Sequence, residues 1–434
     1  MADEDLDRFL ALKPRTDSAS NDPLQLPGPK LERALPVERN TSSMLDLATS
    51  LPARTLSAEG SRWSVERAWP VPGEPAVLAV EVTAVQEPED AATSVPSAGA
   101  ARAESGTATA DASASRRARR AGRFWVQHHQ GLDRPTEHLD LFPPETDPEL
   151  PALRSAAEGG VVIAHEPGLR AVVRHRDGPE ETYTVVLPKG RAGALLAGMR
   201  RAQAFSGPFR LPRMIRHDDS TAAFQALTGI SLHRPRRIGA QAWETAWDQS
   251  LDAWSTAIQH PGELPASTPV HGAATEIRRL KYWEALVRPY IVGAELFQAS
   301  VTAACETLAS IPERRMVPAH RQLRDEDLLY SPELGPALVK VSNAGWAHPA
   351  LDLAGLRACA KWNELRGLWD APRRAVVDRL LNDTSYRNGV PADALDAYER
   401  AALLRLSAQF TFAPGLADAA EALRASLVQS EPRR

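Results

Sequence analysis

The sequence predicts an α+β chain in which a small antiparallel sheet with one helix precedes a larger, mainly helical part. Three β-branched runs are typical of strands: 161–163, 170–174 and 181–187. Asp177-Gly178 lies between the last two runs and is a hairpin signal. From residue 229 onwards the apolar residues recur at helical spacing instead, so the change of period predicts two lobes.

The smaller lobe is predicted over 156–228. After its first three strands, apolar residues at helical spacing predict a helix over 192–205, which Ser206-Gly207-Pro208 ends. Two more strands are expected at 213–216 and 222–227. Together these elements make one antiparallel sheet with a single helix against it.

The larger lobe is predicted to be helical over 229–430. Its clearest signal is an apolar stripe with steps of 4, 4, 3 and 4: Trp243, Trp247, Leu251, Trp254 and Ile258. A stripe of this kind faces a core rather than a cofactor. Further helices are expected at 272–309, with an interruption at Pro289, and at 353–368, 373–381 and 392–412.

The residues before 156 are predicted to form a disordered arm followed by a small β-rich unit. Residues 1–58 are rich in Pro, Ser, Asp and Arg and are expected to be a disordered arm. A small β-rich unit is expected over 59–155, with strands near 78–83 and 123–126. The low-complexity stretch 87–122 has no aromatic side chains to bury, so it is expected to be a disordered insertion in that unit.

Composition narrows the class of protein. The chain has 51 Lys and Arg against 55 Asp and Glu, and this net charge of −4 argues against a nucleic-acid binder. Cys305 and Cys359 are the only cysteines, which excludes a disulfide scaffold and a cysteine-built zinc module. Six lysines against 45 arginines are typical of a GC-rich bacterial genome.

The sequence also predicts a cytoplasmic location without a membrane-spanning helix. It contains no run of 18 apolar residues, and a helix needs about that length to cross a bilayer. The N-terminus, MADEDLDRFL, is acidic where a signal peptide is basic and then apolar.

Two segments between the predicted helices carry a recognisable motif: AHRQLRDEDLLY at 319–330 and LVKVSNAGWAHPALDLAGL at 338–356. They resemble the catalytic region of the aminoglycoside phosphotransferase-like family. In that family a His-Gly/Arg-Asp-Leu-His-x-x-Asn/Gln pattern precedes an Asp-Phe-Asp triplet and then Asp-Pro-Ala-Leu-Asp-Leu. The resemblance covers roughly 160–415 and includes RLSAQFTFAPG at 405–415. It implies a protein-kinase-like two-lobe fold.

The residues that would perform the reaction are altered. Phosphoryl transfer needs an acidic residue at the acceptor hydroxyl, ligands for Mg²⁺ and a lysine on the phosphates. His320 matches the family histidine and Asp352 a supporting acidic residue, but Gln322 stands at the position of the catalytic aspartate. Asp327 stands at a metal-binding position and can still ligate a cation. Lys340 stands at the other metal-binding position, where it replaces a carboxylate by an ammonium.

The nucleotide-binding lysine of the family is also missing. Its strand corresponds to 181–187, where Thr184 occupies the lysine position. Lys189 is the only lysine between residues 31 and 280, so it is the one candidate for a relocated phosphate contact; the alternative is a solvated turn lysine. The turn Glu166-Pro167-Gly168 stands where the family has a phosphate-covering loop.

Because three positions are altered together, we predict a catalytically degenerate aminoglycoside phosphotransferase-like protein, or pseudokinase, with a binding or regulatory role. Its partner is an unidentified protein or small molecule, and any binding of ATP is expected to be independent of Mg²⁺ or absent. The alternative is an active ATP-dependent phosphotransferase acting on a hydroxyl acceptor. In that case Asp325 or Glu326 serves as the base, Asp327 as metal ligand and Lys189 as phosphate contact.

The resemblance leads to one geometric expectation. Because the family counterparts of Asp327 and Lys340 grip the same metal ion, we predict that the Lys340 ammonium approaches the Asp327 carboxylate in the cation's place. The alternative is that Lys340 points to solvent while Asp327 caps a nearby turn.

Overall fold

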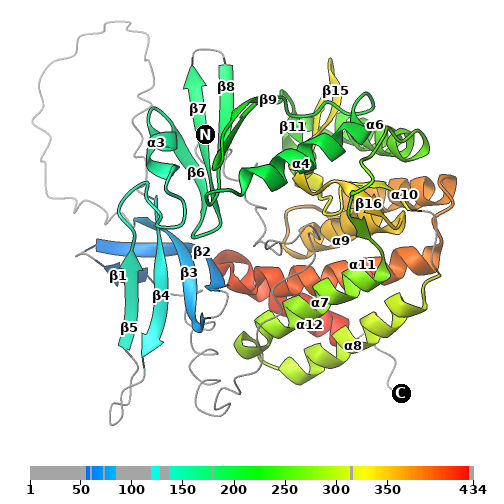
Figure 1. Ribbon diagram of the computed structural model, residues 1–434. Coiled ribbons are helices and arrows are strands. Elements are labelled where there is room, and N and C mark those ends of the chain that lie inside the picture. Colours follow the sequence, from blue (N-terminus) through cyan, green and yellow to red (C-terminus); the bar gives the residue numbers. More distant parts are fainter. Residues whose placement is uncertain are drawn as a thin grey trace, which may run out of the picture.

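The computed structural model of the 434-residue chain describes residues 55–58, 61–71, 74–84, 119–127, 136–177, 180–312 and 316–429. Two antiparallel sheets come first along the chain and a helical lobe follows (Figure 1). The fold class is the predicted α+β class, with a small sheet lobe preceding a larger helical lobe. Most of the predicted disordered arm and insertion lies outside the described residues.

The first sheet contains five strands in the order of the chain: β1 (Thr55–Ala58), β2 (Ser61–Val71), β3 (Glu74–Ala84), β4 (Arg119–Gln127) and β5 (Thr136–Leu141). Two predicted boundaries are wrong here. Strand β1 falls within the predicted arm, and β4 begins at Arg119 inside the predicted insertion. Pairing with β3 extends β4, since Arg119 lies opposite Thr83 and Arg120 donates to the carbonyl of Phe142 at 2.8 Å. Composition does not encode such long-range pairing.

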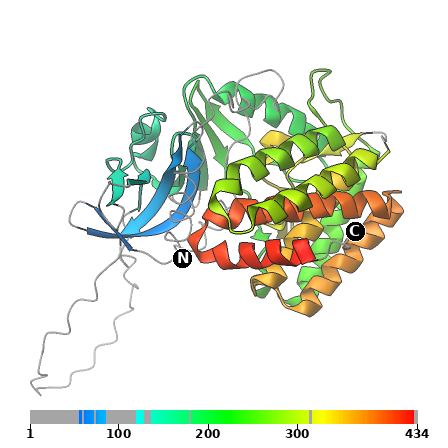
Figure 2. The ribbon, with the colours of Figure 1, turned by 90° about the horizontal axis from the view of Figure 1, so that it is seen from below.

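The first sheet contacts both lobes. The apolar side chains of its buried face, including Trp63, Leu78 and Phe124, belong to the same core as those of the helical lobe. Strand β2 contacts the 3₁₀ helices η6 (Phe410–Phe412) and η7 (Pro414–Leu416), while β3 contacts β6 (Val161–Glu166) of the second sheet. Figures 1 and 2 show this sheet beside the ends of α11 (Ala392–Gln409) and α12 (Ala417–Gln429). The N-terminal sheet is therefore an extension fastened to both lobes.

The second sheet has the strand order β6-β7-β8-β10-β9. Its strands are β6 (Val161–Glu166), β7 (Arg170–Asp177), β8 (Glu180–Val186), β9 (Met214–His217) and β10 (Thr221–Gln225). The helix α4 (Ala192–Ala202) follows β8, so the predicted three strands, one helix and two strands are confirmed. A short helix, α3 (Leu153–Ala157), crosses the predicted unit boundary at 155 and packs on β7 and β8.

The helical lobe contains the predicted helices and two more. Their bounds are α5 (Pro235–Ile238), α6 (Ala240–Gln259), α7 (Ala273–Val287), α8 (Ala294–Ser310), α9 (Ala350–Leu365), α10 (Ala371–Arg387), α11 (Ala392–Gln409) and α12 (Ala417–Gln429). The expected break at Pro289 is confirmed, because the 3₁₀ helix η3 (Arg288–Tyr290) separates α7 from α8. Helices α5 and α12 are the additional ones.

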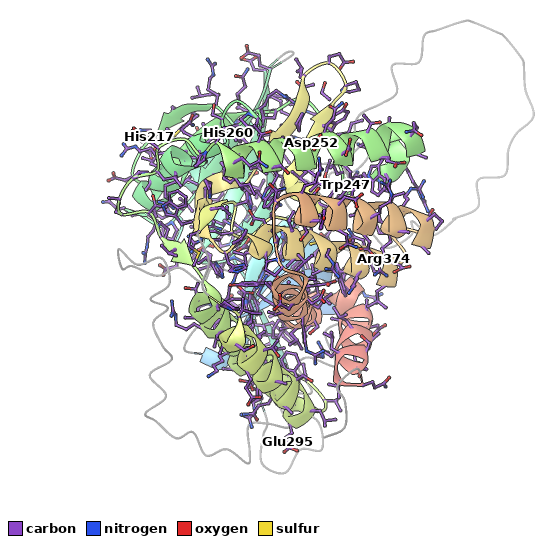
Figure 3. All side chains as sticks on the ribbon, turned by 90° about the vertical axis from the view of Figure 1, so that its right-hand side faces the viewer. His217, Trp247, Asp252, His260, Glu295 and Arg374 are labelled. Carbon is purple, nitrogen blue, oxygen red and sulfur yellow. The ribbon has the colours of Figure 1, made fainter. Side chains whose placement is uncertain are left out.

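The tryptophan stripe of α6 forms a core, as predicted. Trp243 and Trp247 are buried and both pack edge-on against Trp369, with ring centroids 5.2 and 6.0 Å away. Figure 3 shows α6 lying above α10, with Trp247 labelled between them. Cys305 and Cys359 are likewise buried core residues.

Two small three-stranded sheets position the segments that carry the motif. One has the order β11 (Ile230–Ser231), β14 (Leu328–Ser331), β15 (Gly335–Leu338). The other has the order β12 (Val270–His271), β16 (Gly345–Ala347), β13 (Val317–Ala319). Strands β13 and β14 lie at the two ends of the 319–330 segment, and β15 and β16 flank residues 339–344.

A glycine on α4 fixes how closely the small lobe approaches the helical lobe. A Cβ at Gly198 would overlap the carbonyl oxygen of Ser342, which belongs to the 3₁₀ helix η5 (Val341–Asn343). Arg201 of the same helix donates to the carbonyl of Ala344 at 2.6 Å. Because the close neighbour is a backbone carbonyl, a side chain at position 198 would fit only if α4 moved away from η5.

We expect Gly198→Ala to destabilise the protein by about 1–3 kcal/mol through overpacking. Gly193 is the matched control, because it lies on the same helix and a Cβ added there would meet nothing within 4 Å. Gly193→Ala should stabilise by about 0.4–1 kcal/mol, since alanine restricts the unfolded chain. Urea unfolding of both variants measures the difference, and equal effects would contradict the close contact.

Candidate functional site

The segment 319–324 is held in place by Asp352 at the start of α9. Its two carboxylate oxygens accept the backbone N–H groups of His320 at 2.8 Å and Arg321 at 2.9 Å. Burial raises the pKa of Asp352 despite these bonds and the nearby His320. Arg321 has a φ of 67°, a left-handed conformation that is uncommon outside glycine. The two bonds to Asp352 therefore stabilise a strained backbone immediately before Gln322.

The His320 side chain contacts the backbone of the chain and does not line the cavity described below. Its side chain is buried, and Nε2 lies 3.0 Å from the carbonyl oxygen of Val339. Because a carbonyl only accepts, Nε2 carries the proton and donates it. His320 thereby joins the segment 319–324 to the strand end that precedes Lys340.

Lys340 approaches Asp327, as predicted. The Lys340 ammonium lies 3.1 Å from Oδ1 of Asp327 and 3.6 Å from Oε1 of Glu326. The other Asp327 oxygen accepts the N–H of Arg324 at 3.0 Å, at the start of the 3₁₀ helix η4 (Asp325–Asp327). Asp327 therefore caps a turn, as the alternative expected. The other part of the alternative is wrong, because Lys340 faces the Asp327 carboxylate and does not point to solvent.

The charges of this cluster balance. The Arg324 guanidinium lies 3.6 Å from the same Glu326 oxygen that faces Lys340. Asp327 and Glu326 are only 2% and 8% exposed, so water screens them weakly. Two carboxylates are thus compensated by two cations, which removes the local excess of negative charge that draws a metal ion.

Asp325, one of the two alternative bases, is held by two neighbouring side chains. Its Oδ2 lies 2.7 Å from Nδ1 of His233 and accepts a hydrogen bond of 2.7 Å from Asn363. Burial alone raises the pKa of Asp325, but the charge and hydrogen bond of His233, aided by Arg366 and Asn363, outweigh it and hold the pKa below its usual value. A carboxylate stabilised in this way is a weak base.

Thr184 and Lys189 lie away from the cavity between the lobes. Thr184 is paired with Val173 of β7, and that face of the sheet packs on α3. Side chains alternate along a strand, so the neighbours Tyr183 and Val185 line the cavity in its place. The structure therefore does not support Thr184 as a cofactor-binding residue. Lys189 is exposed in the turn after β8, which is the solvated position considered as its alternative.

The cavity itself lies between the second sheet, α4 and the segment that follows β15. It has a volume of about 150 Å³ and is walled by side chains of β7, β8, β10 and α4, and by residues 339–342. Among the predicted site residues, Lys340 lines it, together with the alternative base Glu326. Sequence patterns do not single out Arg170, which also lines the cavity, because an arginine at the start of an edge hairpin has no periodic signature.

The described part of the chain offers neither a metal cluster nor a membrane span. No group of three or more His, Cys, Asp or Glu among these residues is arranged to hold a metal ion. None of the described helices is long and apolar enough to cross a membrane.

A sheet lobe and a helical lobe with a cavity between them define a two-lobe α+β fold. No family model matches the sequence, and none of the curated proteins matches it. Among solved structures, an apo thermostable mutant of the aminoglycoside phosphotransferase APH(4)-Ia is 14% identical, over 63% of this chain and 95% of that chain, with a TM-score of 0.44.

Two further solved structures are similar at the same level. Choline kinase LicA from Streptococcus pneumoniae is 12% identical over 63% of this chain and 94% of that chain, with a TM-score of 0.46. An aminoglycoside-3'-phosphotransferase of type VIII is 17% identical over 58% and 95%, with a TM-score of 0.43. These likenesses concern the fold, so the function is argued below from the residues of this chain.

Proposed function

We propose that this chain is a catalytically degenerate aminoglycoside phosphotransferase-like protein, a pseudokinase that binds a partner instead of transferring phosphate. The observation that carries the proposal is the Lys340 ammonium, 3.1 Å from Asp327 and 3.6 Å from Glu326. An ammonium between two carboxylates compensates the charge that a divalent cation would otherwise compensate.

The acceptor side supports the same proposal. Gln322 stands where the family has its catalytic aspartate, and its carboxamide cannot take a proton from a hydroxyl group. Asp325 is held as a weakly basic carboxylate by His233 and Asn363. Neither residue is suited to activate an acceptor.

The alternative, an active small-molecule phosphotransferase, is favoured by one observation. Glu326 lines the cavity, so its carboxylate is placed where a base could reach a bound acceptor. Two observations oppose the alternative. Lys189 is exposed in its turn and does not line the cavity, so it is poorly placed to contact a phosphate there. Glu326 already faces both Lys340 and Arg324.

We expect purified protein to show no ATP-dependent phosphoryl transfer to hydroxyl acceptors such as aminoglycosides or choline. We also expect that Mg²⁺ does not increase any rise in melting temperature caused by ATP, because a ligand stabilises only the state it binds. A thermal-shift titration with ATP, with and without Mg²⁺, makes the measurement. Turnover that disappears in an Asp327→Ala variant, or a shift that requires Mg²⁺, would overturn the proposal.

A further inference from the structure

The cavity between the lobes has a mainly apolar wall. Six of its side chains come from the sheet, from α4, from the segment joining the lobes and from η5: Val172, Val185, Leu195, Met199, Leu227 and Val341. Two aromatic rings, those of Tyr183 and Phe224, complete the sheet side. An apolar wall of this kind favours a ligand that gains by leaving water.

The cations at the cavity wall already face carboxylates of the chain. Arg170 donates to Oε1 of Glu166 through Nε at 3.1 Å and through its terminal nitrogen at 2.8 Å. Lys340 faces Asp327 and Glu326. Among the described residues that line the cavity, these are the two cations, so a phosphate entering it would have to displace an internal carboxylate.

The turn Glu166-Pro167-Gly168, which stands where the family has a phosphate-covering loop, also binds a carboxylate of the chain. The N–H of Gly168 donates to Oδ2 of Asp147 at 2.7 Å, and Nε2 of His165 lies 2.8 Å from the same oxygen. Burial raises the pKa of Asp147, but the hydrogen bonds from His165 and from the backbone of Gly168 and Glu149 outweigh it and hold the pKa below its usual value. A carboxylate thus holds the backbone amide that such a loop could offer to a phosphate.

The size of the cavity restricts the ligand further. Its volume is about 150 Å³. An apolar cavity of roughly 150 Å³ accommodates a single aromatic ring such as benzene. Sites that bury drug-sized ligands measure roughly 300–1,000 Å³. The observed volume suits a small flat ring system and lies below the range of sites that bury a larger ligand.

We propose that this cavity binds an uncharged, flat, apolar ligand of one or two fused rings and discriminates against phosphorylated compounds. The inference rests on the binding role proposed above, and it names the chemical class of the ligand. The driving force is burial of the ring against the valine, leucine and methionine side chains. The internally paired cations supply the selection against phosphate.

The test uses the full-length protein with indole as the uncharged probe and AMP as a phosphorylated compound that also carries a flat ring. Calorimetric titration should detect indole binding and no AMP binding to the unaltered chain. Val185→Phe fills the cavity from the β8 side and should weaken indole binding at least about tenfold, or roughly 1.4 kcal/mol. Val270→Phe, at a side chain that is 48% exposed, is the matched control and should leave the affinity unchanged.

The outcomes separate this inference from the proposed function. Absence of indole binding, or equal affinity in the Val185→Phe and Val270→Phe variants, overturns the ligand class even if no phosphoryl transfer is found. Binding of AMP tighter than indole overturns it as well. Turnover of ATP with indole binding intact would instead overturn the pseudokinase proposal alone. Thermal unfolding of each variant establishes that a lost signal reflects a filled cavity in a folded protein.

Discussion

Replacing Lys340 by aspartate is expected to destabilise the metal-free protein by about 3–5 kcal/mol, because it removes the cation from two buried carboxylates and leaves their charge uncompensated. The new carboxylate would lie close to those of Asp327 and Glu326, which are 2% and 8% exposed. Three converging carboxylates suit a hard divalent cation with oxygen ligands. We therefore expect Mg²⁺ to raise the melting temperature of this variant and to leave that of the unaltered chain unchanged.

The matched control is Lys340→Asn. Residue 340 has a φ of 57°, and both Asn and Asp tolerate this left-handed conformation. The asparagine variant also removes the ammonium, so it should lose stability, but it adds no carboxylate and should gain little from Mg²⁺. Differential scanning calorimetry of the two variants, with and without Mg²⁺, isolates the added charge. Identical responses to Mg²⁺ would mean that position 340 does not stand in the place of a cation.

The second large effect is expected deep in the helical lobe, at Glu276. This carboxylate is fully buried, is paired with Arg405, and has its Oε2 2.7 Å from Nε2 of His271. Burial lowers the pKa of Arg405 to about 10, and burial together with the charges of Arg321, Arg279 and Arg405 holds the pKa of His271 well below its usual value. The buried Arg405 guanidinium thus depends on the Glu276 charge, and the Nε2–H of His271 donates to the same carboxylate.

Glu276→Gln should therefore lower the free energy of unfolding by about 3–5 kcal/mol, as expected when one partner of a buried pair is removed. Total stability is typically about 5–15 kcal/mol, so urea unfolding should resolve the change easily. The control is Glu244→Gln, which removes the partner of Arg379 in a pair with side chains 36% and 53% exposed. A surface pair contributes about 0–1 kcal/mol. Losses of similar size in both variants would contradict the buried network.

A double variant distinguishes lost charge from altered packing. In Glu276→Leu/Arg405→Leu both members of the pair become apolar, and buried pairs replaced in this way are often neutral or stabilising. We expect the double variant to be more stable than Glu276→Gln. If it is equally unstable, the loss comes from packing in the lobe and not from an unpaired guanidinium.

The sequence by itself determined the features that depend on local period and on chemical identity. The β-branched runs along 161–187 and the apolar stripe from Trp243 to Ile258 predicted a sheet lobe followed by a helical lobe, because β-branched residues favour strands and the helical period records which face is buried. The identities of Gln322 and Lys340 led to the proposal of a degenerate site, since a carboxamide and an ammonium cannot act as carboxylates. The approach of Lys340 to Asp327 then followed from the resemblance.

Only the tertiary structure decided what depends on contacts between distant segments. Thr184 and Val185 are neighbours on β8, but Thr184 lies on the face that packs on α3 and Val185 lines the cavity. The sequence does not record which face of the strand the cavity occupies. Strand β4 extends to Arg119 because β3 pairs with it. Asp147 reaches Gly168 across 21 residues. These contacts depend on chain segments brought together by folding, and local composition carries no signal for such pairing.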